Sequence, residues 1–123
     1  MNVWRRALIL LSGLTGAAGV ALAAWASHRG GGDVLTTAAL FLMIHAGPAA
    51  ALALAPPRRA LLAAASILLA GAILFGGDLA LRFGAGLRPL PVAAPTGGVL
   101  MILGWLWLGC AGLFAGFDAG ADK

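Results

Sequence analysis

Charged side chains are scarce in this sequence: they make up 10% of its 123 residues, whereas hydrophobic residues make up 62%. Soluble domains typically carry about 25% charged and about 45 to 50% apolar residues. A water-soluble chain of this length cannot hide so much apolar surface, because small folds bury the smallest fraction of their surface. The composition therefore excludes a soluble domain and predicts an integral membrane protein.

Cysteine is also scarce, and basic residues do not cluster. Cys110 is the sole cysteine, so neither an intrachain disulfide nor a C-x-x-C motif is possible. The eight Lys and Arg residues stand singly or in pairs rather than in a stripe, which argues against nucleic-acid binding. No catalytic, metal or cofactor motif stands out, so we expect a protein that is not an enzyme and has no metal or cofactor; its expected surroundings are membrane lipid.

Long runs without charge mark the spans. The runs Ala7–Ser27, Val34–Pro57, Ala60–Gly77 and Pro89–Phe117 are separated by segments rich in glycine, proline and arginine. Each is near or above the roughly 18 to 20 residues that a spanning helix needs. We expect one all-α membrane domain over residues 1–123, an antiparallel bundle of four transmembrane helices at about 5–27, 34–55, 60–81 and 95–117.

The first span has aromatic markers and one rival interpretation. Trp4 and Trp25 are about 31 Å apart along a helix, close to the hydrocarbon thickness, as expected for interfacial anchors. A basic start, an apolar stretch and Ala24-Trp25-Ala26 also imitate a secretory signal. The apolar stretch is long for a signal core, so we expect the segment to be retained.

The basic residues predict the orientation. With the amino terminus inside, five of them lie on the cytoplasmic side and three outside; the first group is Arg5, Arg6, Arg58, Arg59 and Lys123, the second Arg29, Arg82 and Arg88. This bias favours both termini in the cytoplasm.

Small residues offer candidate helix contacts. Lipid is as apolar as leucine, so close backbone approach is what distinguishes a helix neighbour from a lipid tail. Gly112-x-x-x-Gly116, and Gly13, Gly16 and Ala17, are candidates, although 19 glycines make chance matches common. Trp105 and Trp107 lie near the middle of the fourth span, and we expect at least one of them inside the bundle.

His45 lies near the centre of the second span, three residues before Pro48. The proline frees the carbonyl of Ile44 and predicts a kink near the histidine. Two interpretations stand: a proton-accepting or ligand-binding group in mid-bilayer, or a neutral imidazole that donates to a carbonyl of a neighbouring helix.

Asp78 and Arg82 are four residues apart and can form an ion pair on one helix face. His28 and Asp78 fall at the same predicted depth, so they can instead meet as a proton relay or metal site. His45 lies about 16 Å deeper than the start of its helix, which argues against a site shared with His28, including a haem.

The segment Pro95-Thr96-Gly97-Gly98 is typical of a helix start, with proline in the first turn. Its exposed N–H groups offer an alternative use as an anion site.

The order of these features resembles a known family. Gly19 to His28, His45, Leu74 to Leu79, Ala94 to Gly98 and Gly104-Trp105 together resemble the YgdD-like family, domain-of-unknown-function family 423, over roughly residues 7–115. The resemblance implies a four-helix protein of the bacterial inner membrane with no assigned activity. The third-span motif departs from the family pattern, because Gly76 and Asp78 stand at serine positions and Ala80 at an aromatic one. A role for Asp78 is therefore not implied for the family.

Three functional hypotheses follow. The leading one is a non-enzymatic accessory or assembly partner of a larger membrane complex, or a homo-oligomer. The alternative is a subunit of a proton, metal-ion or small-solute transporter or channel, with His28, His45 and Asp78 along its path. An intramembrane enzyme acting on lipid is the third, and no polar cleft for it is evident in the sequence.

Overall fold

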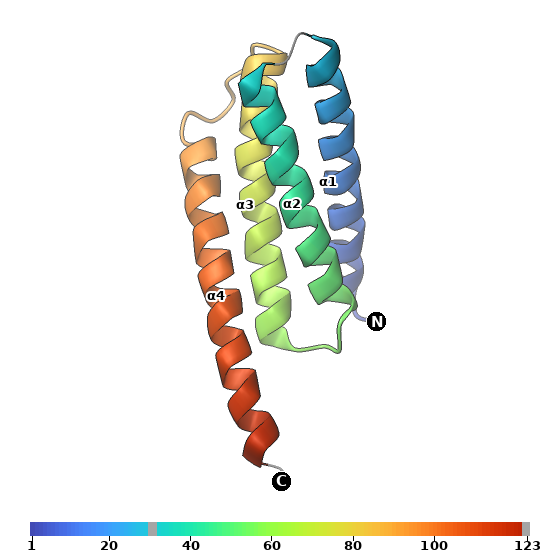
Figure 1. The fold of residues 1–123 in the computed structure, drawn as a ribbon, viewed down its shortest axis with the longest axis vertical. Helices are drawn as coiled ribbons and strands as arrows, with labels where there is room; N and C mark the ends of the chain where they lie inside the picture. The colour runs from blue at the N-terminus through green and yellow to red at the C-terminus, as the bar shows by residue number, and fades with distance from the viewer. Residues whose placement is uncertain (30–31, 122–123) are drawn as a thin grey trace.

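The regular structure consists of four helices in an up-and-down order (Figure 1). The computed structural model describes residues 1–29 and 32–121, and no strand occurs in that part of the chain. The helices are α1 (Val3–His28), α2 (Asp33–Leu54), α3 (Arg59–Gly84) and α4 (Ala93–Ala121). All four are long and apolar enough to cross a membrane. This confirms the predicted all-α membrane protein with an antiparallel bundle of four transmembrane helices.

Local chemistry sets the helix ends. Asn2 caps α1, its side-chain oxygen accepting from the N–H of Arg5 at 2.9 Å. Helix α2 ends before Pro56-Pro57, as expected because a proline disfavours the α conformation in the residue before it. After α3 the chain turns at Gly86, whose φ of 69° suits glycine, and the N–H of Leu87 bonds to the carbonyl of Leu81.

Each helix packs mainly on the next one in the chain. Helix α2 lies between α1 and α3, whereas α1 and α3 touch only sparsely. Among the described residues the α4 backbone approaches α3 alone, and Figure 1 shows α4 at one edge, with its carboxyl end running past the other helices. The bundle is therefore open, and α1 and α4 do not close it into a ring.

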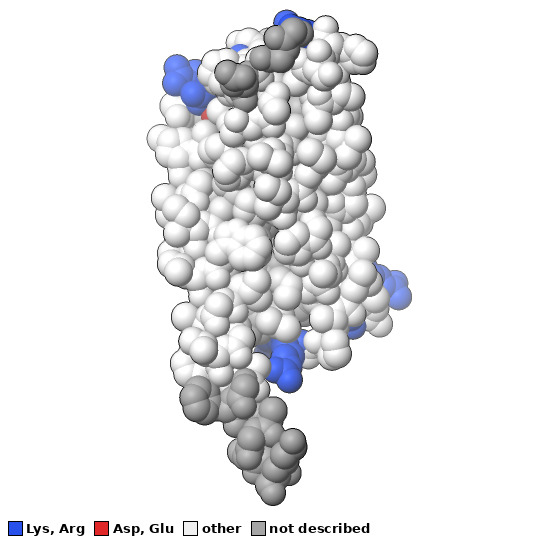
Figure 2. Space-filling model, in the orientation of Figure 1, with Lys and Arg blue, Asp and Glu red and all other residues white. Residues whose placement is uncertain are grey.

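Alanine forms much of the core, which allows close helix packing. One buried cluster joins the first three helices and consists of Leu8, Ala49, Ala53, Leu62, Ala65 and Leu69. Charges lie at the two ends, with an uncharged band between them (Figure 2). We call the end that carries Arg5, Arg6, Arg58 and Arg59 the amino-terminal end. Lys123, assigned to the same side from the sequence, lies outside the described residues.

Candidate functional site

His45 is the buried ionisable group at the centre of α2, and both of its ring nitrogens are in use. Its residue surface is 4% exposed. The indole N–H of Trp105 donates to Nε2 at 3.1 Å, and Nδ1 lies 2.8 Å from the carbonyl oxygen of Phe41. An indole N–H can only donate, so Nε2 must be an acceptor and the proton must sit on Nδ1. The geometry assigns a neutral imidazole in a single tautomer.

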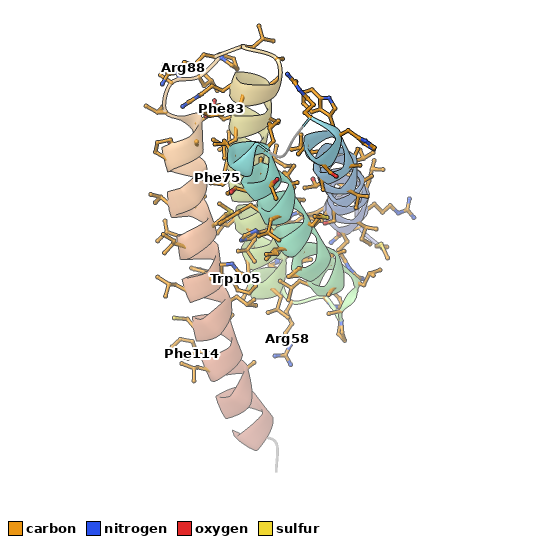
Figure 3. The ribbon with its side chains drawn as sticks, turned by 45° about the horizontal axis from the view of Figure 1, so that its top comes forward. Arg58, Phe75, Phe83, Arg88, Trp105 and Phe114 are labelled. Atoms are coloured by element: carbon orange, nitrogen blue, oxygen red, sulfur yellow. The ribbon has the colours of Figure 1, made fainter. Side chains whose placement is uncertain are left out.

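This arrangement changes one sequence prediction. One of the two interpretations of His45 has its imidazole donate to a carbonyl of a neighbouring helix. The carbonyl that it uses belongs to Phe41 on its own helix, and the neighbouring helix α4 supplies a donor, Trp105. Figure 3 shows Trp105 directed from α4 toward the other helices. Pro48 lies inside α2, as expected.

Aromatic rings surround the imidazole. The Phe41 ring stacks on it with centroids 5.8 Å apart, and the Phe41 and Phe75 centroids are 4.8 Å apart. The Trp105 ring is tilted against the imidazole at 5.9 Å. Trp105 and His45 thus tie α4 to α2 by a side-chain contact, although the two backbones stay apart.

Asp78 and Arg82 form an ion pair on α3, with Oδ2 and Nη2 2.7 Å apart. The Asp78 side chain is 1% exposed and the Arg82 side chain 25% exposed. Asp78 Oδ1 and Arg82 Nε are buried and have no hydrogen-bond partner within the described residues. The pair is therefore only half satisfied, which is unusual for buried polar atoms.

The structure does not bring His28 and Asp78 together. His28 is the last residue of α1 and is exposed, and Arg82 is the one partner of the Asp78 carboxylate within the described chain. His45 lies deeper, on another helix. Over residues 1–29 and 32–121 no group of three metal-ligating side chains gathers, so the three residues do not form one site.

The tryptophans of α1 both lie partly exposed near its ends. The Trp4 indole donates to Ser66 Oγ on α3 at 2.9 Å, and the Ser66 hydroxyl donates to Leu62. At the other end Arg29 lies over the Trp25 ring, 4.7 Å from its centroid. The sequence did not single out Ser66, because a lone serine in an apolar run gives no signal.

The segment Pro95-Thr96-Gly97-Gly98 lies in the first two turns of α4, which begins at Ala93. Gly97 faces α3 so closely that a Cβ on it would lie 2.5 Å from the backbone nitrogen of Phe75 and 2.6 Å from the carbonyl oxygen of Gly71. The helix-start interpretation therefore needs a second part, since Gly97 also permits close approach of α4 to α3. We call this contact the α3–α4 seam.

Two of the glycines predicted as contacts face open space. A Cβ on Gly13 or Gly112 would meet no atom within 4 Å, whereas one on Gly16 would make an ordinary contact with Ala46. Within the described residues, therefore, Gly112 does not allow a close approach to another helix. The side-chain surroundings of Gly116 lie outside what the structure describes.

A groove of about 500 Å³ runs between α1 and α2 on the outer surface. We call it the α1–α2 groove. Its residues are mostly small: Ser12, Gly13, Gly16, Ala17, Val20, Met43, Ala46, Gly47 and Ala50. Ser12 is 2% exposed, and its hydroxyl oxygen has no hydrogen-bond partner in the described chain.

Comparison with known proteins gives one match. The model of the family described as "protein of unknown function (DUF423)" matches residues 10–98, which span His28, His45, Asp78 and the Pro95 to Gly98 segment. No curated protein and no solved structure matches the chain.

Proposed function

We propose that this chain, which belongs to the DUF423 family of proteins of unknown function, is a non-enzymatic accessory or assembly partner of a larger membrane complex. It is a multi-pass membrane protein by its four apolar helices. The proposal rests on one observation above others, the α1–α2 groove, in which two glycines, Gly13 and Gly47, face open space.

Gly13 and Gly47 carry the argument. A Cβ on either residue would meet nothing within 4 Å, so the chain does not need glycine there for its own packing. Glycine disfavours a helix interior by about 1 kcal/mol relative to alanine in water. Small residues on a lipid-facing helix surface allow another backbone to approach closely, and this is the main source of helix association in membranes. Two such positions in one groove support docking of a partner's transmembrane helix.

Ser12 adds a polar contact to this groove. Its hydroxyl is unpartnered, and hydroxyls in membrane helices commonly bond across helix interfaces. A rotation about its χ1 angle redirects the hydroxyl toward an incoming helix. The groove therefore offers close approach together with one hydrogen bond.

The test is photocrosslinking in native membranes, with a crosslinking amino acid at the exposed groove residue Ala17. We expect one discrete protein adduct, which is lost in Gly13→Leu and Gly47→Leu because the added side chains fill the groove. Gly109→Leu is the matched control: Gly109 is exposed on α4, faces open space and lies outside the groove. Adducts with lipid only, or an adduct that survives both groove substitutions, would remove the proposal.

One observation favours transport as a second candidate: the unpartnered Oδ1 of Asp78 beside the buried Nε of Arg82. His45 contributes little to a path in this arrangement, because both of its ring nitrogens are occupied. Proteoliposome flux of protons or metal ions that disappears in Asp78→Asn would support this function. Flux in the unmodified protein that is no higher than in empty liposomes, or that is unchanged in both Asp78→Asn and His45→Ala, would exclude it.

We also propose that the chain resides in the bacterial inner membrane with both termini in the cytoplasm. The four arginines at the amino-terminal end support this orientation, against Arg29, Arg82 and Arg88 at the other end. Reporter fusions after Arg58 and after Arg88 would test it. We expect a cytoplasmic signal from the first fusion and a periplasmic signal from the second.

A further inference from the structure

The sparse contact between α1 and α3 leaves a long groove between them. Two open cavities, of about 720 and 310 Å³, are both lined by Leu11 and Ile73, so they lie next to each other along this groove. Its walls are almost entirely apolar. We call it the α1–α3 groove; it lies on the other side of α1 from the α1–α2 groove.

A polar pocket adjoins this groove at the amino-terminal end. It has a volume of about 480 Å³ and is lined by Asn2, Trp4, Pro57, Arg59 and Leu62. Trp4 also lines the apolar groove, so its indole stands between the two spaces, held by its bond to Ser66. Along this surface a polar pocket, a tryptophan and an apolar groove follow one another. A phospholipid has the same sequence of polar headgroup, interface and apolar acyl chain.

The pocket is positively charged, and its arginines form no ion pair within the described part of the chain. Arg59 is exposed and has no partner in the described chain, and the same is true of Arg6 and Arg58. Arg5 differs, because it donates three hydrogen bonds to the carbonyls of Ala53, Leu54 and Ala55 and so serves the fold. No acidic residue occurs in residues 1–10 or 54–62.

The helix ends add to this field. Both α1 and α3 begin here, and the positive ends of their dipoles attract anions. No side chain caps the start of α3; the N–H groups of Leu61 and Leu62 bond to the carbonyl of Arg58, which leaves the N–H groups of Arg59 and Ala60 available. The Asn2 oxygen is used in capping α1, which leaves its amide NH2 group as a donor.

We propose that the α1–α3 groove binds an anionic phospholipid, with the phosphate held by Arg59 beside Asn2 and Trp4 and one acyl chain along the groove. Charge complementarity selects this occupant, because a guanidinium matches phosphate oxygens in a fork and no ion pair with a carboxylate involves Arg59 within the described residues. One leaflet is about 15 Å of hydrocarbon thick, which equals about ten residues of helix. The acyl chain therefore extends from Trp4 to the level of Leu11 and Thr15.

The experiment measures lipid binding to the detergent-purified chain by native mass spectrometry. Phosphatidylglycerol is the probe, phosphatidylcholine with the same acyl chains is the zwitterionic comparison, and glycerol phosphate represents the headgroup alone. We expect phosphatidylglycerol to bind about fivefold or more tightly than phosphatidylcholine, the effect of about one arginine near a charged surface. Glycerol phosphate should bind far more weakly, because it cannot fill the groove.

Two pairs of variants separate headgroup from acyl chain. Arg59→Gln should abolish the preference for phosphatidylglycerol, whereas Arg88→Gln, an equal charge change at the other end, should keep it. Ala70→Phe, which fills the groove, should weaken both phospholipids, whereas Ala51→Phe on the exposed side of α2 should not. Equal binding of the two phospholipids in the unmodified chain, equal effects of the two arginine variants, or full binding by Ala70→Phe would overturn the proposal.

Discussion

The α3–α4 seam and the α1–α2 groove use glycine in opposite ways. At the seam, a Cβ on Gly97 would meet the backbone of α3 at 2.5 and 2.6 Å, so the helices touch through the missing side chain. In the groove, Gly13 and Gly47 face open space. The first use stabilises this chain, and the second leaves a surface available to another.

The difference also concerns what a helix can tolerate. Gly19, on the buried face of α1, would place its Cβ 2.6 Å from Met43 Cγ, on a flexible side chain that can move, and its nearest backbone atom would be the Ala39 carbonyl oxygen at 3.1 Å. Gly97 faces backbone atoms, which cannot move without separating the helices. A glycine is therefore most constrained where its neighbour is backbone, and the following substitutions test this difference.

Gly97→Ala should have the largest effect, because the added methyl must push α4 away from α3. We expect a loss of about 3 kcal/mol in the free energy of unfolding, at the upper end of overpacking effects. The measurement is reversible unfolding in mixed micelles, followed by circular dichroism. Gly98→Ala is the matched control, since Gly98 has open space beside it. Equal losses in the two variants would mean that the seam is not closely packed.

Arg5→Met should rank second, because α1 and α2 are joined at the amino-terminal end by three hydrogen bonds from this guanidinium. Methionine keeps much of the stem and removes the donors. We expect a loss of about 2 kcal/mol in the same unfolding assay, as for hydrogen bonds from charged groups. Arg6→Met, at an exposed side chain, should change stability little. An unchanged free energy of unfolding in Arg5→Met would show that helix packing alone holds α1 in place.

Trp105→Phe should have a smaller effect, removing the N–H that pairs with His45 Nε2 while it retains most of the ring. A buried acceptor left unpaired costs about 1 to 3 kcal/mol, and we expect a value near the lower limit because Trp105 is 43% exposed. Trp107→Phe, which removes a bond to the carbonyl of Ala60, should cost less. Nitrogen chemical shifts of His45 provide a second readout. A shifted Nε2 signal in Trp105→Phe, but not in Trp107→Phe, would locate the effect, while the proton should stay on Nδ1 because the Phe41 carbonyl still accepts from it.

Gly13→Ala should have the smallest effect on the isolated chain. With nothing within 4 Å, the methyl meets no neighbour, and alanine is the better helix former. We expect the free energy of unfolding to stay within about 0.5 kcal/mol or to rise. A loss of unfolding free energy as large as that in Gly97→Ala would show that glycine in the α1–α2 groove is as constrained as glycine at the α3–α4 seam.

The fold was predictable from sequence because hydrocarbon thickness sets the length of an apolar run. The expected third span stopped at residue 81, whereas α3 continues to Gly84. Asp78 and Arg82 explain the difference, since their ion pair lets the helix continue through two charged positions. The depth of His45 was likewise predictable, because position along a helix determines depth.

The contacts between helices were less predictable. Equal depth suggested that His28 and Asp78 meet, but depth does not determine which way a helix face points, and α1 and α3 hardly touch. Trp105 bonds to a histidine 60 residues away, a pairing that depends on the rotation of α4 about its axis. The sequence named Gly97 for its place at a helix start, and only the seam shows that it is needed for close approach.

Each helix packs mainly on the helix that precedes it in the chain, and this has a consequence for biosynthesis. Helix α2 packs on α1, α3 packs on α2, and among the described residues the α4 backbone packs on α3 alone. Such neighbour-to-neighbour contacts have short sequence separation, which favours rapid folding. The bundle can thus assemble helix by helix during insertion. The bond between Trp105 and His45 forms only when α4 has the correct rotation about its axis.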